Sequence, residues 1–423
     1  MGLHLGTRFG LMSDMDDVVD VIIVGAGAAG LMAALRAAER GKRALLLEKN
    51  RKPGVKILMS GGTRCNMTQA TDNRGIVEAY GPPGKFLHSA LAAFSVQDTI
   101  DFFEAGGVAT KVEETGKIFP VSNKAGDVLN ALLRRLQRSG ASLALEEPLV
   151  DVTVADGQFR VGSSKRTLST SKVVLTTGGQ SYPGSGTTGD GYRIAERLGH
   201  RIVTPRPALV PLTTDAPWVA ELRGVTLPDV AVRVMETAET LVLRRGSLLF
   251  AHFGLSGPVI LDVSRIVSGH AEPRSLIVEI DLLPAISADE LTGWLRDESL
   301  AAGKRQLALV LSQKVPRRVA EVTIAQAGMA NDRKAAGLSR EDRNRLIDAL
   351  KRLRVPITGT LGFKKAEVTA GGIALDEIDS RTMQSKRVPG LYLAGEILDL
   401  DGPIGGYNFQ AAWSTGWLAG SSV

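Results

Sequence analysis

The strongest constraint on the fold lies near the start of the chain, where residues 21–30 read V-I-I-V-G-A-G-A-A-G. Four apolar residues predict a buried strand that runs directly into G-x-G-x-x-G and a helix, expected over 31–40. Gly25 allows a tight turn, Gly27 lacks the Cβ that would block a pyrophosphate, and Gly30 lets the helix pack closely on the strand. This arrangement predicts a dinucleotide-binding domain of the Rossmann type.

An acidic residue follows at the spacing that a dinucleotide site needs. A second apolar strand is expected over 43–47 and ends in Glu48. The carboxylate stands about 20 residues after the first glycine, where it can accept hydrogen bonds from ribose hydroxyls. The intervening helix directs its free N–H groups, and about half a positive charge, toward the phosphates. A glycine-rich turn without a ligand is the weaker alternative.

A second G-x-G-x-x-G, at 184–189, is weaker evidence for a nucleotide. It also precedes a helix, expected to start at Asp190, but the strand before it ends near Thr177. A long irregular connection therefore replaces the immediate turn that the motif requires, and no acid-terminated strand follows. We interpret this segment as a flexible loop near the active site and not as a second dinucleotide site.

The end of the chain carries another glycine-rich segment, with L-A-G-E at 393–396 and D-G-P-I-G-G-Y-N-F-Q at 401–410. A buried strand ending in Gly-Glu and a double glycine before a final helix, expected over 407–419, are two anchors for a ligand. The Glu396 carboxylate can bind ribityl hydroxyls. The positive end of the helix can face a flavin pyrimidine edge, where negative charge collects on reduction. A glycine-rich surface turn is less favoured because apolar strands flank it.

At 423 residues the chain exceeds one ordinary core, so two or three domains are expected. Short alternating apolar runs after residue 200 resemble a small β-barrel or sandwich. Boxes of the S-x-x-E type then predict helices, and strands return from residue 355. This order predicts an α/β fold. A Rossmann-type FAD-binding domain is formed by both chain ends (19–200 and 369–423), with an inserted small β-barrel-like domain (201–284 and 355–368) and an inserted helical domain (285–354).

Composition excludes several classes of protein. No apolar run is long enough to span a bilayer, and residues 1–18 lack the features of a signal peptide, which favours a disordered extension or a misplaced start. Cys65 is the only cysteine, which excludes an internal disulfide and a thiolate metal cluster. No spacing suggests a metal site or a Ser-His-Asp arrangement. We expect a cytoplasmic protein without metal or membrane.

The formal net charge is +6, and most of the excess lies between residues 285 and 354, which hold 14 Lys and Arg against 9 Asp and Glu. A basic face can attract RNA or another polyanion. A charged helical surface is the commoner explanation of such a segment.

With these residues in place, the chain resembles the BaiN/YhiN-like family of NAD(P)/FAD-dependent oxidoreductases over nearly everything from Val21 to Gly420. One departure is that Thr63 follows Gly61 and Gly62 where the family usually has three glycines before R-C-N. A threonine at this position has fewer allowed backbone conformations than a glycine beside the isoalloxazine, but it should not abolish FAD binding. Besides the segments above, the matching motifs are L-M-S-G-G-T-R-C-N-M-T (58–68), F-P-V-S (119–122), T-G-G-Q-S-Y-P-G-S-G-T-T-G-D-G-Y (177–192), R-P-A-L-V-P-L (206–212), H-F-G-L-S-G-P (252–258) and G-F-K-K-A-E-V-T-A-G-G (362–372).

The resemblance implies bound FAD, NAD(P)H as a transient electron donor, and two inserts that form a lid over the flavin. Known activities of relatives are reductions of activated C=C bonds, namely saturation of a dehydro-bile acid and conversion of a uridine in large-subunit ribosomal RNA to dihydrouridine. Motifs and resemblance together predict contacts with the cofactor from Gly25, Gly27, Ala28, Ala29, Gly30, Glu48, Lys49, Gly62, Arg64, Cys65, Asn66, Thr177, Gly178, Gly179, Gly395, Glu396, Asp401, Gly405, Gly406, Tyr407 and Asn408.

Reduction of such a bond needs a hydride from the flavin, a proton donor on the opposite side and donors that polarise the conjugated carbonyl. Cys65, in the flavin-proximal loop, is one candidate acid, although a lone cysteine is more often a buried filler. His252 and Tyr407 are the other candidates, and packing is the ordinary role of both. Arg64 can bind the FAD phosphates or polarise a carbonyl, and we favour the cofactor role.

Three functions are compatible with these features. We place first the reduction of uridine to dihydrouridine in large-subunit ribosomal RNA, which would bind through the basic helical insert and gain from counterion release at each phosphate contact. No RNA-binding module or aromatic cluster supports it. A reductase of a small-molecule enone, such as a dehydro-steroid or bile acid, comes second. A flavin-binding assembly or redox-sensing protein without turnover is the alternative of another class.

Overall fold

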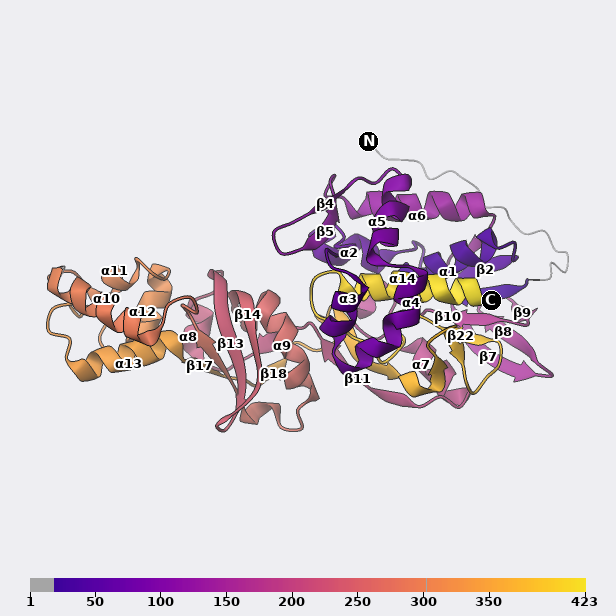
Figure 1. Ribbon diagram of the computed structural model, residues 1–423. Coiled ribbons are helices and arrows are strands. Elements are labelled where there is room, and N and C mark those ends of the chain that lie inside the picture. The colour runs from indigo at the N-terminus through magenta and orange to yellow at the C-terminus, as the bar shows by residue number, and fades with distance from the viewer. Residues whose placement is uncertain (1–18, 302) are drawn as a thin grey trace. The chain divides into compact units, whose positions relative to one another are not determined.

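The computed structural model describes residues 19–301 and 303–423 and divides into two compact units (Figure 1). The terminal unit comprises the described residues up to Pro205 together with Val368–Val423, and the inserted unit comprises Arg206–Glu367. The prediction made for residues 1–18 falls outside the described part of the chain. A mixed α/β fold is confirmed, and one of its units is formed by both chain ends.

A seven-stranded sheet forms the centre of the terminal unit. Five strands run parallel in the order β22-β10-β1-β2-β6, and β21 and β20 continue the sheet beyond β22 in antiparallel orientation. The four residues of β1 are all buried, as expected for a central parallel strand covered on both faces. The strands are β20 (Ile378–Asp379), β21 (Gln384–Ser385), β22 (Leu391–Leu393), β10 (Val173–Leu175), β1 (Val21–Val24), β2 (Ala44–Leu47) and β6 (Ser142–Ala144).

The first and last helices of the terminal unit pack against each other, so the two ends of the chain lie side by side (Figure 1). Helix α1 (Ala28–Glu39) begins earlier than expected, and α14 (Tyr407–Ser422) ends later. Gly416 and Gly420 of α14 face α1. A Cβ at either glycine would overlap the carbonyl oxygen of Ala29 or Ala33, respectively. The two backbones can approach this closely only because both positions lack a side chain.

The remaining elements of the terminal unit lie around this core. Helical periodicity over residues 85–104 predicts a single helix, but the helix is broken because Phe94 is extended and Ser95 caps a new helix through a capping box with Asp98. The helices are α2 (Val55–Thr63), α3 (Asn73–Tyr80), a 3₁₀ turn (Pro82–Leu87), α4 (His88–Ala93), α5 (Val96–Ala105), α6 (Ala125–Ser139), a 3₁₀ turn (Pro183–Ser185), α7 (Asp190–Arg197) and a 3₁₀ turn (Leu375–Glu377). The small sheets contain β3 (Thr68–Gln69), β5 (Lys117–Pro120) and β4 (Thr110–Val112); β7 (Leu149–Ala155), β8 (Gln158–Ser163) and β9 (Thr167–Thr170); and β11 (Ile202–Ala208) and β19 (Val368–Ile373).

The inserted unit contains a seven-stranded sheet and six α-helices (Figure 1). Its sheet is open, because the described strands β17 and β18 form its two edges and do not pair with each other. Strand pairing therefore does not close the barrel-like domain that we expected. In sheet order the strands are β17 (Leu353–Pro356), β16 (Leu276–Asp281), β13 (Thr226–Glu236), β14 (Glu239–Ala251), β15 (Gly254–Ser256), β12 (Leu212–Thr213) and β18 (Gly359–Thr360). The helices are α8 (Pro217–Glu221), α9 (Pro258–Gly269), α10 (Ala288–Ala301), α11 (Leu307–Leu311), α12 (Arg317–Gln326) and α13 (Arg340–Lys351), with a 3₁₀ turn at Pro273–Ser275.

One hydrophobic core joins the strands and the helices of the inserted unit. Val232 and Val278 of the sheet belong to the same buried cluster as Leu291 of α10 and Leu346 of α13. Amphipathic helices bury their apolar stripe on the nearest apolar surface, which here includes the sheet. The boundaries of the three domains that we assign from composition stay a prediction, and the contacts themselves divide the chain into two units.

A buried network of Ser385, His200 and Glu377 links the hairpin of β20 and β21, with the residue before it, to the segment after α7. No pattern in the sequence predicts it. His200 Nδ1 lies 3.0 Å from Glu377 Oε2, and its Nε2 lies 2.9 Å from Ser385 Oγ. Ser385 Oγ also accepts hydrogen bonds from the backbone N–H groups of Arg387 and Val388. Burial lowers the pKa of His200, and the hydrogen bond and negative charge of Glu377 act in the opposite direction. Since Ser385 is buried and already bonded on three sides, this network fastens the hairpin rather than performing nucleophilic catalysis.

Candidate functional site

The turn between β1 and α1 has the close packing that its glycines predict. Gly25 has a φ of +99°, and a Cβ there would lie 2.7 Å from the carbonyl oxygen of Thr176. A Cβ at Gly30 would overlap the carbonyl oxygen of Gly25. Thr176 Oγ1 donates to this same turn, which closes β1 against β10. The first and third glycines are therefore required by the protein itself.

The second glycine of the motif is different, because a Cβ at Gly27 would meet nothing within 4 Å. Gly27 is the N-cap of α1, its φ is −83°, and neither a capping side chain nor an acidic residue occupies the first turn. The space at the Cβ position of Gly27 is therefore open, and no acidic side chain of the first turn competes for the first N–H groups of this helix. This is the environment in which a helix N-terminus binds phosphate.

Glu48 lies directly beside the turn, at the end of β2. Its carboxylate accepts hydrogen bonds of 2.8 Å from the backbone N–H groups of Ala26 and Asn50. Burial raises the pKa of Glu48 against the opposing effect of these bonds. A carboxylate has four lone-pair positions, so the group can still accept bonds from ribose hydroxyls.

The second glycine-rich loop is tied to the end of β2. Lys49 Nζ donates to Thr188 Oγ1 at 2.9 Å and to Asp190 Oδ2 at 2.7 Å, and Asn50 Nδ2 donates to Ser185 O at 2.9 Å. Lys49, which we expected to contact the cofactor, therefore forms an ion pair within the protein. These bonds fix the 184–189 loop and the start of α7 to the end of β2. Our interpretation of residues 184–189 as a flexible loop near the active site stays a prediction.

Glu396 is the centre of a polar cluster that the sequence analysis only partly anticipated. One carboxylate oxygen accepts a hydrogen bond from Lys56 Nζ at 2.6 Å, and the other accepts bonds from Ser181 Oγ at 2.6 Å and the Thr369 N–H at 2.9 Å. Lys56 also donates to Ser181 Oγ. Four separate segments thus meet at the residue expected to bind ribityl hydroxyls. Lys56, Ser181 and Thr369 carried no local signal that could have identified them.

The end of α2, from Ser60 on, departs from helical geometry and forms a loop before Cys65 with an unusual backbone. Gly61, Gly62, Thr63 and Cys65 all have φ between +55° and +70°. Thr63 adopts this conformation where the resembling family usually has glycine. Left-handed conformations cost a non-glycine residue about 1–3 kcal/mol and cluster at functional sites.

The side chains of this loop are held by the protein. Arg64 donates to Glu113 at 2.6 Å, and its guanidinium lies 4.0 Å from the centre of the Phe119 ring. The Cys65 side chain is fully buried, and burial raises the pKa of its thiol to about 12. Cys65 therefore remains a protonated thiol at neutral pH, within the hydrophobic core of the terminal unit.

Three buried polar atoms have no hydrogen-bond partner within the described structure, namely Asn66 Oδ1, Gln69 Oε1 and Thr177 Oγ1. An unsatisfied buried polar group costs about 1–3 kcal/mol, so each needs an explanation. Asn66 and Thr177 are two of the residues expected to contact the cofactor, whereas Gln69 was not anticipated. Together with the open space at Gly27, these acceptors fit a bound ligand with polar groups, as FAD has.

The C-terminal loop packs on the segment that follows Cys65. Gly406 has a φ of +95°, and a Cβ there would lie 2.6 Å from the carbonyl group of Thr68. Thr68 Oγ1 donates to the buried Gln410 at 2.6 Å, and Trp413 Nε1 donates to Met67 O at 2.9 Å. The N-terminus of α14 is thus fixed against the loop that carries Cys65 and Asn66.

Within this C-terminal loop, the side chain of Asn408 forms two hydrogen bonds with the backbone of Gly402. It accepts from the Gly402 N–H and donates to the Gly402 carbonyl, both at 2.9 Å. The ring of Tyr407 lies beside Gly405, and the backbone carbonyl of Tyr407 accepts a bond from Tyr80 Oη at 3.0 Å. Tyr407 is partly exposed, whereas Asp401 is buried.

The carboxyl ends of three neighbouring parallel strands therefore converge in the terminal unit. A Cβ at Gly395, after β22, would lie 2.8 Å from Ala29 Cβ at the start of α1. Gly178 and Gly179 follow β10, and Gly179 packs on Thr369. Ligands of open α/β sheets bind at this edge. His252 belongs instead to the inserted unit, on an exposed turn between β14 and β15, with its ring 5.0 Å from that of Phe253.

Among the described residues, no helix combines the length and the hydrophobicity of a membrane span. No group of three or more His, Cys, Asp or Glu side chains among them could hold a metal ion.

Comparison with known proteins places this geometry in context. The model of the HI0933-like protein Rossmann domain family matches residues 19–422. The chain is 37% identical to a ribosomal RNA dihydrouridine synthase of Escherichia coli (strain K12), over 96% of this chain and 98% of the relative. It is 31% identical to a 3-dehydro-bile acid delta(4,6)-reductase of Clostridium scindens, over 95% and 98%. A solved structure of 3-ketosteroid delta1-dehydrogenase from Sterolibacterium denitrificans has the same fold, with a TM-score of 0.51 and 14% identity over 95% of this chain and 98% of that one.

Proposed function

Because the chain belongs to the HI0933-like family of Rossmann-domain proteins, we propose that it reduces a uridine of large-subunit ribosomal RNA to dihydrouridine. It is an oxidoreductase that takes its electrons from NAD(P)H and acts on an activated C=C bond in the cytoplasm. The observation that carries this proposal is the 37% identity to a ribosomal RNA dihydrouridine synthase, which extends over 96% of this chain. A match over the whole length includes both units and not only the nucleotide-binding motif.

We propose FAD as the resident cofactor. When bound, FAD supplies the hydride that the reduction needs. Gly27 and the N-terminus of α1 would receive the pyrophosphate, and Glu48 would bind ribose hydroxyls. The unpartnered polar atoms of Asn66 and Thr177 support the same assignment, since the Asn66 oxygen needs a donor and the Thr177 hydroxyl needs a donor or an acceptor. The Lys56 ammonium holds the Glu396 carboxylate in place and balances its charge.

Of the three proton donors that the sequence suggests, we put Tyr407 first. Its ring is partly exposed at the start of α14, within the loop expected to bind the flavin, whereas the Cys65 thiol is fully buried. A phenol placed opposite the hydride can protonate the second carbon, and such general acids contribute about 10²–10⁴ to the rate.

Tyr407→Phe is therefore expected to retain FAD and to lower turnover by about 10²–10⁴-fold, measured as substrate-dependent reoxidation of the reduced enzyme. Cys65→Ala is the matched variant and should keep both FAD and turnover. Full activity of Tyr407→Phe together with loss in Cys65→Ala would return the acid role to the thiol, and loss only in His252→Ala would assign it to the inserted unit.

Loss of the protein should abolish one dihydrouridine of large-subunit ribosomal RNA. The measurement is mass-spectrometric mapping of that RNA from a strain lacking the protein, before and after complementation with the full chain. The site should return with the wild-type chain and stay absent with Gly27→Val. Unchanged modification in the deletion strain would remove the RNA substrate from the proposal.

Reduction of a small-molecule enone is the second candidate, favoured by the 31% identity to a bile acid reductase over 95% of this chain. Purified enzyme reduced by NADPH separates the possibilities. Reoxidation by ribosomal RNA supports the first proposal, and reoxidation by a dehydro-steroid supports the second. A flavin that stays oxidised under excess NADPH would indicate a binding protein without turnover.

A further inference from the structure

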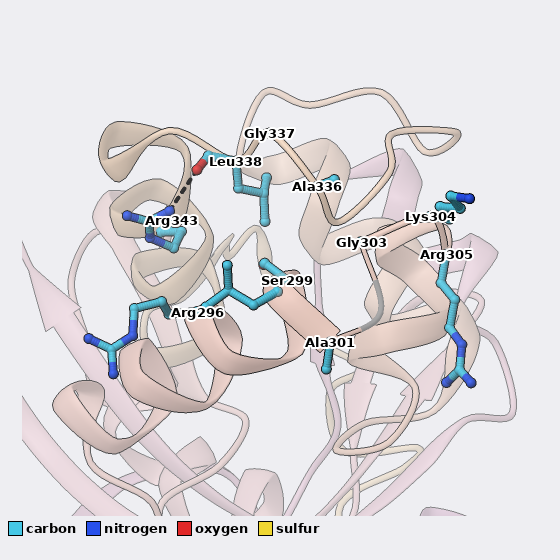
Figure 2. Close-up of a pocket in the computed structure, with 11 residues that line it drawn as sticks. Arg296, Ser299, Ala301, Gly303, Lys304, Arg305, Ala336, Gly337, Leu338 and Arg343 are labelled. Carbon is cyan, nitrogen blue, oxygen red and sulfur yellow. Dashed lines mark hydrogen bonds between the residues drawn. The ribbon is translucent and has the colours of Figure 1, made fainter.

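We propose that a basic groove in the inserted unit binds the phosphate backbone of the RNA substrate. This inference rests on the proposed function and assigns a specific contact site to it. The groove has a volume of about 680 Å³ and lies between the C-terminal end of α10, with the loop that follows, and the loop that leads into α13 (Figure 2). We call its four cations, Arg296, Lys304, Arg305 and Arg343, the groove cations.

The groove cations stand on opposite sides of the groove and no carboxylate lines it. Figure 2 shows Arg296 and Arg343 on one side and Lys304 and Arg305 on the other. Every other described residue that lines the groove is uncharged. Four like charges around one groove whose lining holds no carboxylate raise the local concentration of anions.

Few carboxylates of the described protein neutralise the groove cations. Lys304 and Arg305 have no ion pair among the described residues, and Arg296 reaches only the exposed Asp297 of its own helix, at 3.3 Å. An exposed pair of this kind contributes about 0–1 kcal/mol. Of the other cations between residues 285 and 354, Lys314, Arg318, Lys334 and Arg340 also have no described ion pair. The remaining six are paired with carboxylates, in Arg317–Glu321, Arg333–Asp342, Arg345–Asp342, Lys351–Asp281, Arg352–Asp348 and Arg354–Glu279.

The floor of the groove keeps the backbone accessible. Arg343 donates to the carbonyl of Leu338 at 2.6 Å, which fixes the loop before α13 and leaves other N–H groups of the guanidinium for a ligand. A Cβ at Gly303 would lie 2.8 Å from Ala336 Cβ, so the glycine brings the two loops together. Gly337 has a φ of +84° and open space where a side chain would stand.

This chemistry fits a phosphodiester chain better than bases or a single small anion. No aromatic side chain lines the groove on which a base could stack. Cations on two facing sides of an open groove can neutralise successive phosphates. Each neutralised phosphate releases counterions, which makes the binding sequence-independent and dependent on salt.

The test uses the full-length protein carrying FAD and protein-free large-subunit ribosomal RNA. Lys304→Gln combined with Arg305→Gln should weaken binding about tenfold or more at low salt. It should also lower the slope of log K against log salt by roughly 1.4–1.8, because two contacts of 0.7–0.9 each are lost. The matched control is Arg160→Gln with Arg244→Gln, which removes two exposed cations outside the groove that have no described ion pair. The control should change affinity less than about twofold.

Reduction by NADPH should be unchanged in both double variants, which shows that each remains a folded, loaded enzyme. Equal RNA affinity of the groove variant and the control would overturn the groove while leaving the proposed function intact. Displacement of the RNA by a free nucleoside triphosphate at equal phosphate concentration would instead indicate a site for small anions. Wild-type protein that neither binds nor modifies ribosomal RNA would overturn both proposals.

Discussion

A valine at position 27 is expected to abolish FAD binding while the apoprotein remains folded. A Cβ at Gly27 meets no protein atom within 4 Å, and its φ of −83° and ψ of −167° suit a β-branched residue. The new side chain would occupy the space in front of the N-terminus of α1, where the proposed pyrophosphate needs to approach the backbone N–H groups. We expect colourless protein that unfolds at the temperature of the wild-type apoprotein, since the stabilisation by bound FAD is lost. The FAD affinity should fall at least about 100-fold, measured by reconstitution titration; 100-fold corresponds to about 2.8 kcal/mol.

Two further glycine variants make this prediction specific. Gly126→Val in α6 also enters open space, but in a helix away from the motif, and should change neither stability nor FAD content. Gly30→Val should fail to fold, because its side chain would overlap the carbonyl oxygen of Gly25. Wild-type FAD affinity in Gly27→Val would show that no phosphate approaches this turn, and the cofactor assignment would then be wrong.

Local patterns in the sequence predicted the elements of the glycine-rich motif well. Strand β1, the glycine turn, α1 and Glu48 follow one another within 30 residues, and each has its own signal: a buried apolar run, three glycines at fixed spacing, helical periodicity and a terminal acid. Short-range patterns of this kind depend on backbone geometry and burial, which are properties of the local chain. Helical periodicity alone does not predict the break at Phe94, because the break depends on the capping box that Ser95 and Asp98 form at the start of the next helix.

The other half of the site depends on contacts between distant segments. Lys56 and Glu396 are 340 positions apart, and Thr68 and Gln410 are 342 apart. Neither Lys56 nor Gln410 differs in type or spacing from an ordinary surface lysine or helical glutamine. Their roles become visible only when the sheet brings β1, β10 and β22 together. The burial of Cys65 has the same cause, since the core that covers it comes from both ends of the chain.

Gly416→Val is expected to cause a large loss of stability at the contact between α14 and α1. Its Cβ would overlap the carbonyl oxygen of Ala29 and lie 2.9 Å from the Cα of Ala29. The helix cannot easily move away, because Thr415 Oγ1 accepts a bond from the Gly395 N–H and Trp413 donates to Met67 O. Overpacking in a well-packed core costs about 1–3 kcal/mol of stability, occasionally more. Here the added side chain would stand between the backbones of α14 and α1, which cannot change rotamer to make room. We expect insoluble protein, or a strongly lowered unfolding temperature in thermal denaturation.

Gly293→Val, within α10, is the matched control, since a Cβ there meets nothing within 4 Å and the substitution tests only the helix propensity of valine. Gly416→Ala, which adds one carbon, should destabilise less than valine and more than the control. Because Ala29 lies two residues after Gly27, any folded fraction of either Gly416 variant should also bind FAD more weakly. Stability of Gly416→Val close to that of Gly293→Val would mean that α1 and α14 do not pack as tightly as described. The joining of the two chain ends around one nucleotide turn would then lose its physical basis.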